Sequence, residues 1–157
     1  MAMIDVGGKA KTLRIARAGA LVRMNRLLIK RIKKNDIPKG NVLECARIAG
    51  ILAAKKTSDL IPLCHNIELE SVELNFKFKK SGIRIESLAK ATAKTGVEME
   101  AIVASSVAAI TIYDMCKMFS KTIEIQDIYL LEKRGGKSGV YKRKDFFDKL
   151  QPDKRRG

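Results

Sequence analysis

The chain has 157 residues, 46% of them hydrophobic, and its 32 basic and 17 acidic side chains give a net charge of +15. This length and composition exclude a disordered chain and predict one domain, residues 1–157, with a buried core and a basic tail from about residue 143. Residues 1–9 lack the apolar run of a signal peptide, and the most apolar stretch, residues 101–113, is shorter than the roughly 20 residues that cross a bilayer. We therefore expect a soluble cytoplasmic protein that binds no membrane.

The start of the sequence predicts a strand and a short helix. Leu13 and Ile15 alternate with polar or small neighbours, which indicates a strand that continues toward Met24. A helix is expected from residue 25 to about residue 34, because a segment with turn-forming residues follows it.

A second helix and a hairpin follow. Asn41 and Glu44 have the spacing of a capping box, and small or apolar residues recur at helical spacing to about residue 56. Residues 72–86 alternate between apolar and polar side chains on both sides of a Lys-Ser-Gly turn, which predicts an antiparallel hairpin.

The last predicted elements are a long helix and a strand. Thr95 and Glu98 suggest another capping box, which would open a helix from about residue 97 to residue 120. A strand starts near Ile123, and its alternation slips at residues 126–127, which predicts a β-bulge. This order of elements favours an α+β domain with a ferredoxin-like antiparallel sheet and helices packed on one face.

The cysteines and the single histidine exclude some site types. Cys45, Cys64 and Cys116 cannot all pair, and with one histidine no protein-only metal site is expected. That histidine, His65, follows Leu63 and Cys64 in a predicted loop between a helix and the hairpin. A packing role and a role as a hydrogen-bonding or titrating group both remain open.

Two carboxylates stand at the start of the long helix. Glu98 and Glu100 flank Met99 and cannot share one helical face. They could stabilise the helix N-terminus by their charge, or they could bind the N–H edge of a guanine-like ring.

An acid–lysine pair stands at the other end of the same helix. Asp114 and Lys117 are three residues apart and therefore lie near each other, either as an exposed ion pair or as a partly buried proton-transfer pair. Glu100 and Asp114 are fourteen residues apart, about 21 Å along a helix axis at 1.5 Å per residue. If both groups serve one small site, that site must combine opposite helix ends from two subunits, which predicts a homo-oligomer.

The glycine-rich loop, residues 135–139, contains Gly-Lys-Ser but is not a P-loop, because Leu131 stands where the earlier glycine would be required. Lys133 and Lys137 could still hold phosphates through charge, as could Lys39 in a separate turn.

Several phrases together resemble one family. The stretches that carry the resemblance are Met3–Val6, Lys39–Val42, Ala46–Gly50, LIPLCH (60–65), KTGVEMEA (94–101), TIYDMCK (111–117) and Gly135–Gly139. In this order they closely resemble the cyclic pyranopterin monophosphate synthases, molybdenum cofactor biosynthesis protein C, over about residues 3–142.

The resemblance implies an enzyme, a phosphorus–oxygen lyase. It would convert (8S)-3′,8-cyclo-7,8-dihydroguanosine 5′-triphosphate to cyclic pyranopterin monophosphate and diphosphate. It also implies hexamers, built as trimers of dimers, with active sites at a subunit interface. No cofactor is required, although Mg²⁺ could accompany the triphosphate. The implied catalytic residues are Asp114, Lys117 and Lys39, and the implied substrate-binding residues are Leu63, Cys64, His65, Glu98, Met99, Glu100, Lys133, Lys137, Arg14 and Asp5.

A nucleic-acid-binding protein is the competing interpretation, because an excess of basic side chains attracts polyanions. Against it, the sequence contains no helix-turn-helix, zinc-finger or aromatic RNA-binding motif, and aromatic residues make up only 5% of the chain. We therefore expect no nucleic-acid partner.

Overall fold

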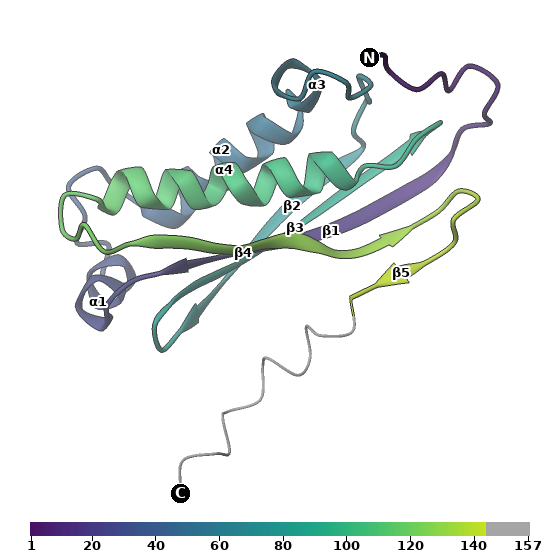
Figure 1. Cartoon of the computed structure of the whole chain (residues 1–157). Coiled ribbons are helices and arrows are strands. Elements are labelled where there is room, and N and C mark those ends of the chain that lie inside the picture. The colour runs from purple at the N-terminus through teal and green to yellow at the C-terminus, as the bar shows by residue number, and fades with distance from the viewer. Residues whose placement is uncertain (144–157) are drawn as a thin grey trace, which may run out of the picture.

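The computed structural model describes residues 1–143 and contains one antiparallel sheet with helices on one face (Figure 1). The sheet order is β2-β3-β1-β4-β5. The elements are β1 (Thr12–Arg23), α1 (Arg26–Lys33), α2 (Val42–Ala54), α3 (Thr57–Leu60), β2 (Ser71–Lys79), β3 (Gly82–Ala93), α4 (Glu98–Cys116), β4 (Glu124–Arg134) and β5 (Tyr141–Lys142). The predicted ferredoxin-like α+β fold is confirmed. The basic tail expected from about residue 143 lies almost wholly outside the described residues.

The buried face of the central strand is made of small side chains. In β1, Ala16, Ala18 and Ala20 are at most 1% exposed and face the helices, whereas Leu13 is 48% exposed. The strand predicted from its alternation is confirmed, but the alanine positions supply its core face. Since alanine leaves little bulk above the sheet, α4 can lie close against β1 and β3.

A glycine allows α2 and α4 to approach each other. A Cβ at Gly50 would lie 2.7 Å from Leu74 Cδ2 and 2.8 Å from the carbonyl oxygen of Ala104 in α4. Asn41 caps α2 as predicted, since its side chain accepts a hydrogen bond from the Glu44 backbone N–H at 3.1 Å.

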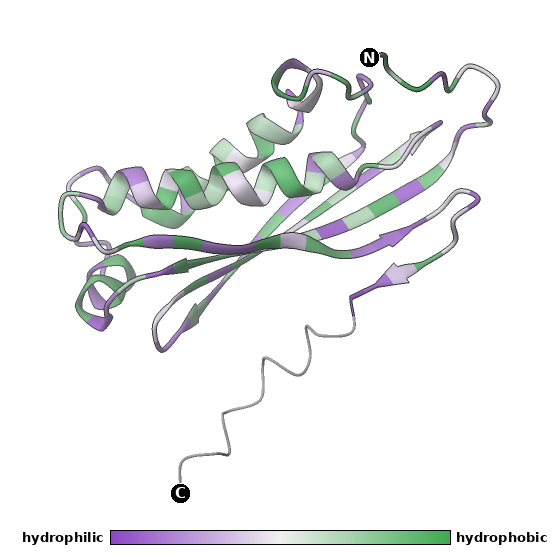
Figure 2. Cartoon of the chain, viewed as in Figure 1, coloured by the Kyte–Doolittle hydropathy of each residue, from purple (hydrophilic) through white to green (hydrophobic). Residues whose placement is uncertain are grey.

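The helix α4 is apolar along nearly its whole length, as Figure 2 shows. By length and composition it is the one helix in residues 1–143 that could cross a membrane. It packs instead against the sheet and against α2, as the core helix of the domain.

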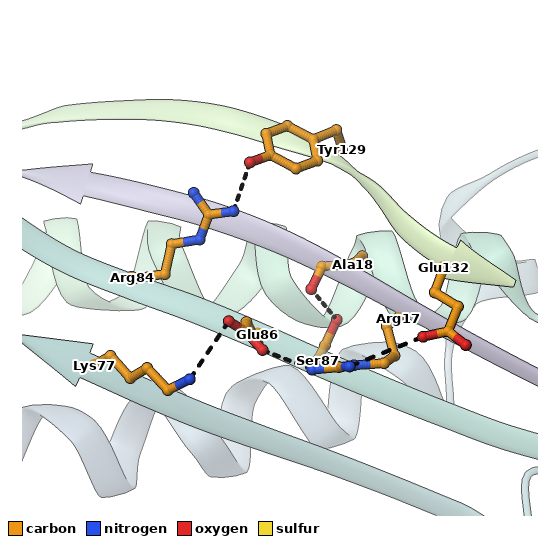
Figure 3. A network of polar contacts seen from close by, with 8 residues as sticks. All are labelled: Arg17, Ala18, Lys77, Arg84, Glu86, Ser87, Tyr129 and Glu132. Atoms are coloured by element: carbon orange, nitrogen blue, oxygen red, sulfur yellow. Dashed lines mark hydrogen bonds and ion pairs between the residues drawn. The ribbon is translucent and has the colours of Figure 1, made fainter. Parts of the chain in front are cut away.

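The opposite face of the sheet carries charged side chains (Figure 3). Arg17 binds Glu86 at 2.8 Å, and Lys77 lies 3.8 Å from the same carboxylate. Arg84 donates to the Tyr129 hydroxyl at 2.5 Å. The two hydrophobic core clusters of the described residues therefore lie on the helix side of the sheet.

The structure corrects three details of the sequence prediction and confirms one. Thr95 does not form a capping box, since the residue before α4 is Val97 and it makes no side-chain cap. The helix ends at Cys116 rather than near residue 120, and α3 and β5 were not predicted. The predicted bulge is confirmed, because the register of β4 shifts where Asp127 adopts a φ of 53°.

Candidate functional site

The loop with the histidine meets the start of α4 in a cavity of about 370 Å³. Six of the ten predicted substrate-binding residues line it, and these are Leu63, Cys64, His65, Glu98, Met99 and Glu100. The sequence brings them together because α2 runs antiparallel to α4, so the chain leaving α3 arrives beside the N-terminal end of α4 (Figure 1). The structure thus joins two segments that lie more than thirty residues apart in the sequence.

Glu100 is a buried carboxyl group at the base of this cavity. It is 3% exposed, and its Oε2 atom has no hydrogen-bond partner among residues 1–143. Burial raises the pKa of Glu100, and the nearby Glu98 adds to that rise. Burial also raises the pKa of the Cys64 thiol, with a further contribution from Glu100. A buried acceptor of this kind is suited to a ligand that brings N–H donors.

A second cavity, of about 600 Å³, adjoins the first and carries the basic side chains. Arg14, Lys133 and Lys137 all line it. The residues common to both cavities are Lys9, Thr95, Gly96 and Glu98. The two cavities therefore adjoin each other across these shared residues, with carboxylates in the smaller cavity and cationic side chains in the larger one.

Glu98 and Lys133 connect the two halves. Lys133 Nζ lies 2.9 Å from Glu98 Oε1, and both side chains are partly buried. A side chain at residue 96 would collide with the Glu98 carboxylate, so glycine there gives Glu98 its position. Glu98 is thus paired with a lysine of β4 rather than capping its own helix.

The predicted catalytic residues lie at the other end of α4. Lys117 Nζ is 2.7 Å from Asp114 Oδ1, and Lys39 Nζ is 2.8 Å from Asp114 Oδ2. Hydrogen bonds from Lys117 and then from Lys39 lower the pKa of Asp114 to about 2, and Asp114 in turn raises the pKa of Lys117. The predicted pair exists, and Lys39 joins it.

This cluster is exposed within one chain. Lys117 and Asp114 side chains are 56% and 52% exposed, so the partly buried form of the pair is not present in a single subunit. Because α4 separates the cluster from both cavities, one chain does not bring Lys39 next to the glycine loop.

Asp5 does not line either cavity. Its side chain accepts a hydrogen bond from the Gly7 backbone N–H at 2.7 Å and shapes the N-terminal segment. Its neighbours Ile4 and Val6 line the smaller cavity. Asp5 therefore orders a wall of the site.

Sequence reasoning missed several residues that line the site, chiefly Lys9 and Lys94. Lys94 donates to the Gly7 carbonyl at 2.7 Å, and Lys9 borders both cavities. Lys94 opens the KTGVEMEA phrase, which is a signal that could have identified it. Lys9 carries no such signal beyond its Gly-Gly-Lys context.

The sequence profile of the MoaC family matches residues 3–136, which is most of the chain. The chain belongs to the MoaC family. A cyclic pyranopterin monophosphate synthase from Novosphingobium aromaticivorans is 54% identical over 140 residues, 89% of each chain. Proteins of the same name from Peptoclostridium acidaminophilum and Desulfitobacterium hafniense are each 52% identical, over 90% and 91% of this chain and 90% and 88% of their own.

The MoaC match covers both ends of α4 and every residue that lines the two cavities except Lys137 and Ser138, which lie just beyond it. No group of three or more histidine, cysteine, aspartate or glutamate side chains that could hold a metal ion occurs within residues 1–143. The charged side chains that line the two cavities are glutamates, lysines and arginines.

Proposed function

We propose that this MoaC-family chain is a cyclic pyranopterin monophosphate synthase of the cytoplasm. It would convert (8S)-3′,8-cyclo-7,8-dihydroguanosine 5′-triphosphate to cyclic pyranopterin monophosphate and diphosphate, in molybdenum cofactor biosynthesis. The observation that carries the proposal is the pair of adjoining cavities at the start of α4, one lined by a buried carboxyl group and the other by basic side chains. Such a site matches a substrate with a donor-rich ring at one end and a polyanionic chain at the other.

The two halves of the site take different parts of this substrate. Glu100 accepts hydrogen bonds from N–H groups of the purine-derived ring. These bonds would satisfy its Oε2 atom, which has no partner among residues 1–143. Lys137 and the part of the glycine loop that lines the basic cavity, residues 135–138, take the triphosphate, and Mg²⁺ could accompany it there.

A second copy of the chain supplies Asp114, Lys117 and Lys39. No charged side chain occurs between residues 101 and 113 of α4, yet Ile110 is 55% exposed. On α2, Ile48 is 59% exposed. A helix without charge on any face is normally covered on all sides, so this outer surface of α2 and α4 calls for an apolar partner.

Symmetry makes a second copy the natural partner for that surface. Residue 107 is the midpoint between Glu100 and Asp114 on α4. A twofold axis that passes near Val107 and pairs the helices antiparallel places Asp114 of the partner subunit beside Glu100. Two equivalent sites then form in each dimer, and three such dimers would make the hexamer implied by the family resemblance.

The same pairing gives Lys117 the environment that proton transfer needs. In one chain its charge is solvated and stabilised by Asp114. Covering the pair with a second subunit and with substrate removes water, and desolvation favours the neutral form of lysine. Lys117 would then exchange protons with the substrate during ring opening and pterin formation.

Closure of the cyclic phosphate is a substitution at phosphorus. A sugar-derived hydroxyl oxygen forms a bond to the innermost phosphorus, and the bond from that phosphorus to the bridging oxygen breaks. The hydroxyl proton passes to a base of the site, and diphosphate leaves with the electron pair. Lys39 and the basic cavity orient the phosphates and stabilise the charge that develops on the leaving group.

Turnover of the cyclised nucleotide tests the proposal. The wild-type chain should release diphosphate and give a product that becomes a fluorescent pterin on oxidation. Lys117→Ala should lose turnover by about 10²-fold or more and stay folded, because general acid–base groups contribute 10²–10⁴-fold. Lys121→Ala, an exposed lysine just beyond α4, is the matched control. Near-normal turnover by Lys117→Ala would remove Lys117 from the mechanism.

The nucleic-acid alternative makes a different prediction. A wild-type chain that binds generic DNA tightly, with strong salt dependence, and leaves the cyclised nucleotide unchanged would favour that alternative.

A further inference from the structure

Arg14 makes an unusual set of contacts at the floor of the basic cavity. It lies near the start of β1, on the side of the sheet that faces α4. Its Nε donates to the carbonyl of Ala93 at 3.4 Å and its Nη2 to the carbonyl of Lys94 at 3.4 Å. Its Nη1 donates to the carbonyl of Gly135 at 3.2 Å. The three nitrogens thus hold backbone from two segments, the end of β3 and the start of the glycine loop.

The glycine loop is shaped to lie against this guanidinium group. A Cβ at Gly136 would lie 2.5 Å from Arg14 Cζ, and the φ of Gly136 is +75°. Gly139, in the same loop, has a similar φ of +67°, but a Cβ there would meet nothing within 4 Å. Gly136 therefore has two reasons to be glycine, close approach and backbone conformation, whereas Gly139 has only the second.

Two of the cationic groups of the cavity already bind groups of the protein. Each side-chain nitrogen of Arg14 donates to a backbone carbonyl, and Lys133 is paired with Glu98. A planar fork that binds three carbonyls fixes geometry in a way that a point charge cannot. Lys137 is carried by the loop itself, so its position depends on where the loop is held.

We propose that Arg14 is a positioning residue, which ties the glycine loop, residues 135–139, to the turn between β3 and α4, residues 94–96. This contact sets the width of the basic cavity and so its fit to a phosphate chain. The inference rests on the proposed function for the nature of the ligand, since it assigns the cavity to the triphosphate. The coupling of the two segments is a property of the protein alone and can be tested separately.

Two variants test the contact from its two sides. Arg14→Lys keeps the charge but replaces three separate donor nitrogens by one, which cannot reproduce the geometry of the three contacts. Gly136→Ala keeps Arg14 but drives the loop away from it. Each should raise KM for the cyclised nucleotide by about tenfold, with a smaller change in kcat, because ground-state binding of the phosphates is lost. The double variant should be little worse than the poorer single variant, since both break the same contact.

Gly139→Ala is the matched control. It imposes the same backbone strain without a collision, so its KM should stay closer to that of the wild type. Inorganic triphosphate should inhibit the wild type and the control more strongly than either Arg14→Lys or Gly136→Ala. A KM for Arg14→Lys equal to that of the wild type would show that charge alone is needed and would overturn the proposal.

Amide hydrogen exchange separates this inference from the proposed function. In Arg14→Lys, exchange should accelerate together in residues 94–96 and 135–139, whether or not the protein turns over the nucleotide. Unchanged exchange in either segment would overturn the positioning role. Coupled acceleration in Arg14→Lys, together with no turnover by the wild-type chain, would keep the positioning role and refute the proposed function instead.

Discussion

Glu100 shows how one buried side chain links stability to function. Its carboxyl group is 3% exposed, beside a second carboxylate and without a partner for one oxygen in the described part of the chain. An unpaired acceptor held in this way costs folding free energy unless a ligand supplies the donors. In the proposed function, the N–H edge of the substrate supplies these donors.

The stability of Glu100→Gln relative to the wild type should increase as pH rises. Burial raises the pKa of Glu100, so its favourable contribution is present below its unfolded pKa, about 4.3, and is lost as pH rises through the raised folded value. Glutamine does not titrate. The melting temperature of Glu100→Gln relative to the wild type should therefore be higher at pH 8 than at pH 4, while turnover falls.

Glu98→Gln is the control for this measurement, because it breaks the ion pair with Lys133 and should lower the melting temperature at neutral pH. If the relative melting temperature of Glu100→Gln did not change with pH, the carboxyl group would not carry the burial cost that we assign to it.

At the residue scale, the sequence predicted a contact between neighbours on one helix but not the contacts that depend on how the elements pack. The spacing of Asp114 and Lys117 required them to meet, and they do. The arrival of Lys39 at the same carboxylate depends on the antiparallel packing of α2 on α4, which no local pattern contains. The pairing of Glu98 with Lys133 has the same cause, since β4 must first be placed beside the start of α4.

At the scale of elements, the close contact of α2 with α4 depends on Gly50. Gly50→Ala should destabilise the fold by about 1–3 kcal/mol, because the added methyl group would press on Leu74 and on the carbonyl of Ala104. Chemical denaturation measures this difference. Cys45→Ala, at an exposed position of the same helix, should leave the free energy of unfolding near that of the wild type. A Gly50→Ala protein as stable as the wild type would show that the helices can move apart at little cost.

The elements themselves were predictable where periodicity was strong. The hairpin and the order of helices and strands follow from alternation and spacing, and the bulge in β4 followed from a slip in that alternation. The two ends of α4, and with them the absence of a cap at Thr95, were not predictable, because packing against the sheet fixes where the helix begins and ends. The buried alanine face of β1 was not predicted, because alanine in a sequence is a weak indicator of burial.

For the whole molecule, the proposed assembly depends on the uncharged stretch of α4, residues 101–113, and on the exposed Ile48 of α2. Ile110→Glu places a charge in the proposed apolar interface, near the twofold axis, so it should cut the mass in solution to about half or less and abolish turnover. Light scattering coupled to size-exclusion chromatography gives the mass. Leu27→Glu, at an exposed position of α1 away from that surface, is the control. An unchanged mass and activity for Ile110→Glu would exclude this surface as the interface.

Complementation between two inactive variants tests the shared site most directly. Glu100→Gln and Lys117→Ala affect opposite ends of α4, and each homo-oligomer should be inactive. When the two are unfolded together and refolded as a mixture, each mixed dimer contains one site with both changes and one site with neither. Turnover should then recover to about a quarter of the wild-type level, as random pairing of subunits around a twofold axis requires. A mixture that stays inactive while forming mixed oligomers would contradict the account, because it would mean that each chain completes its own site.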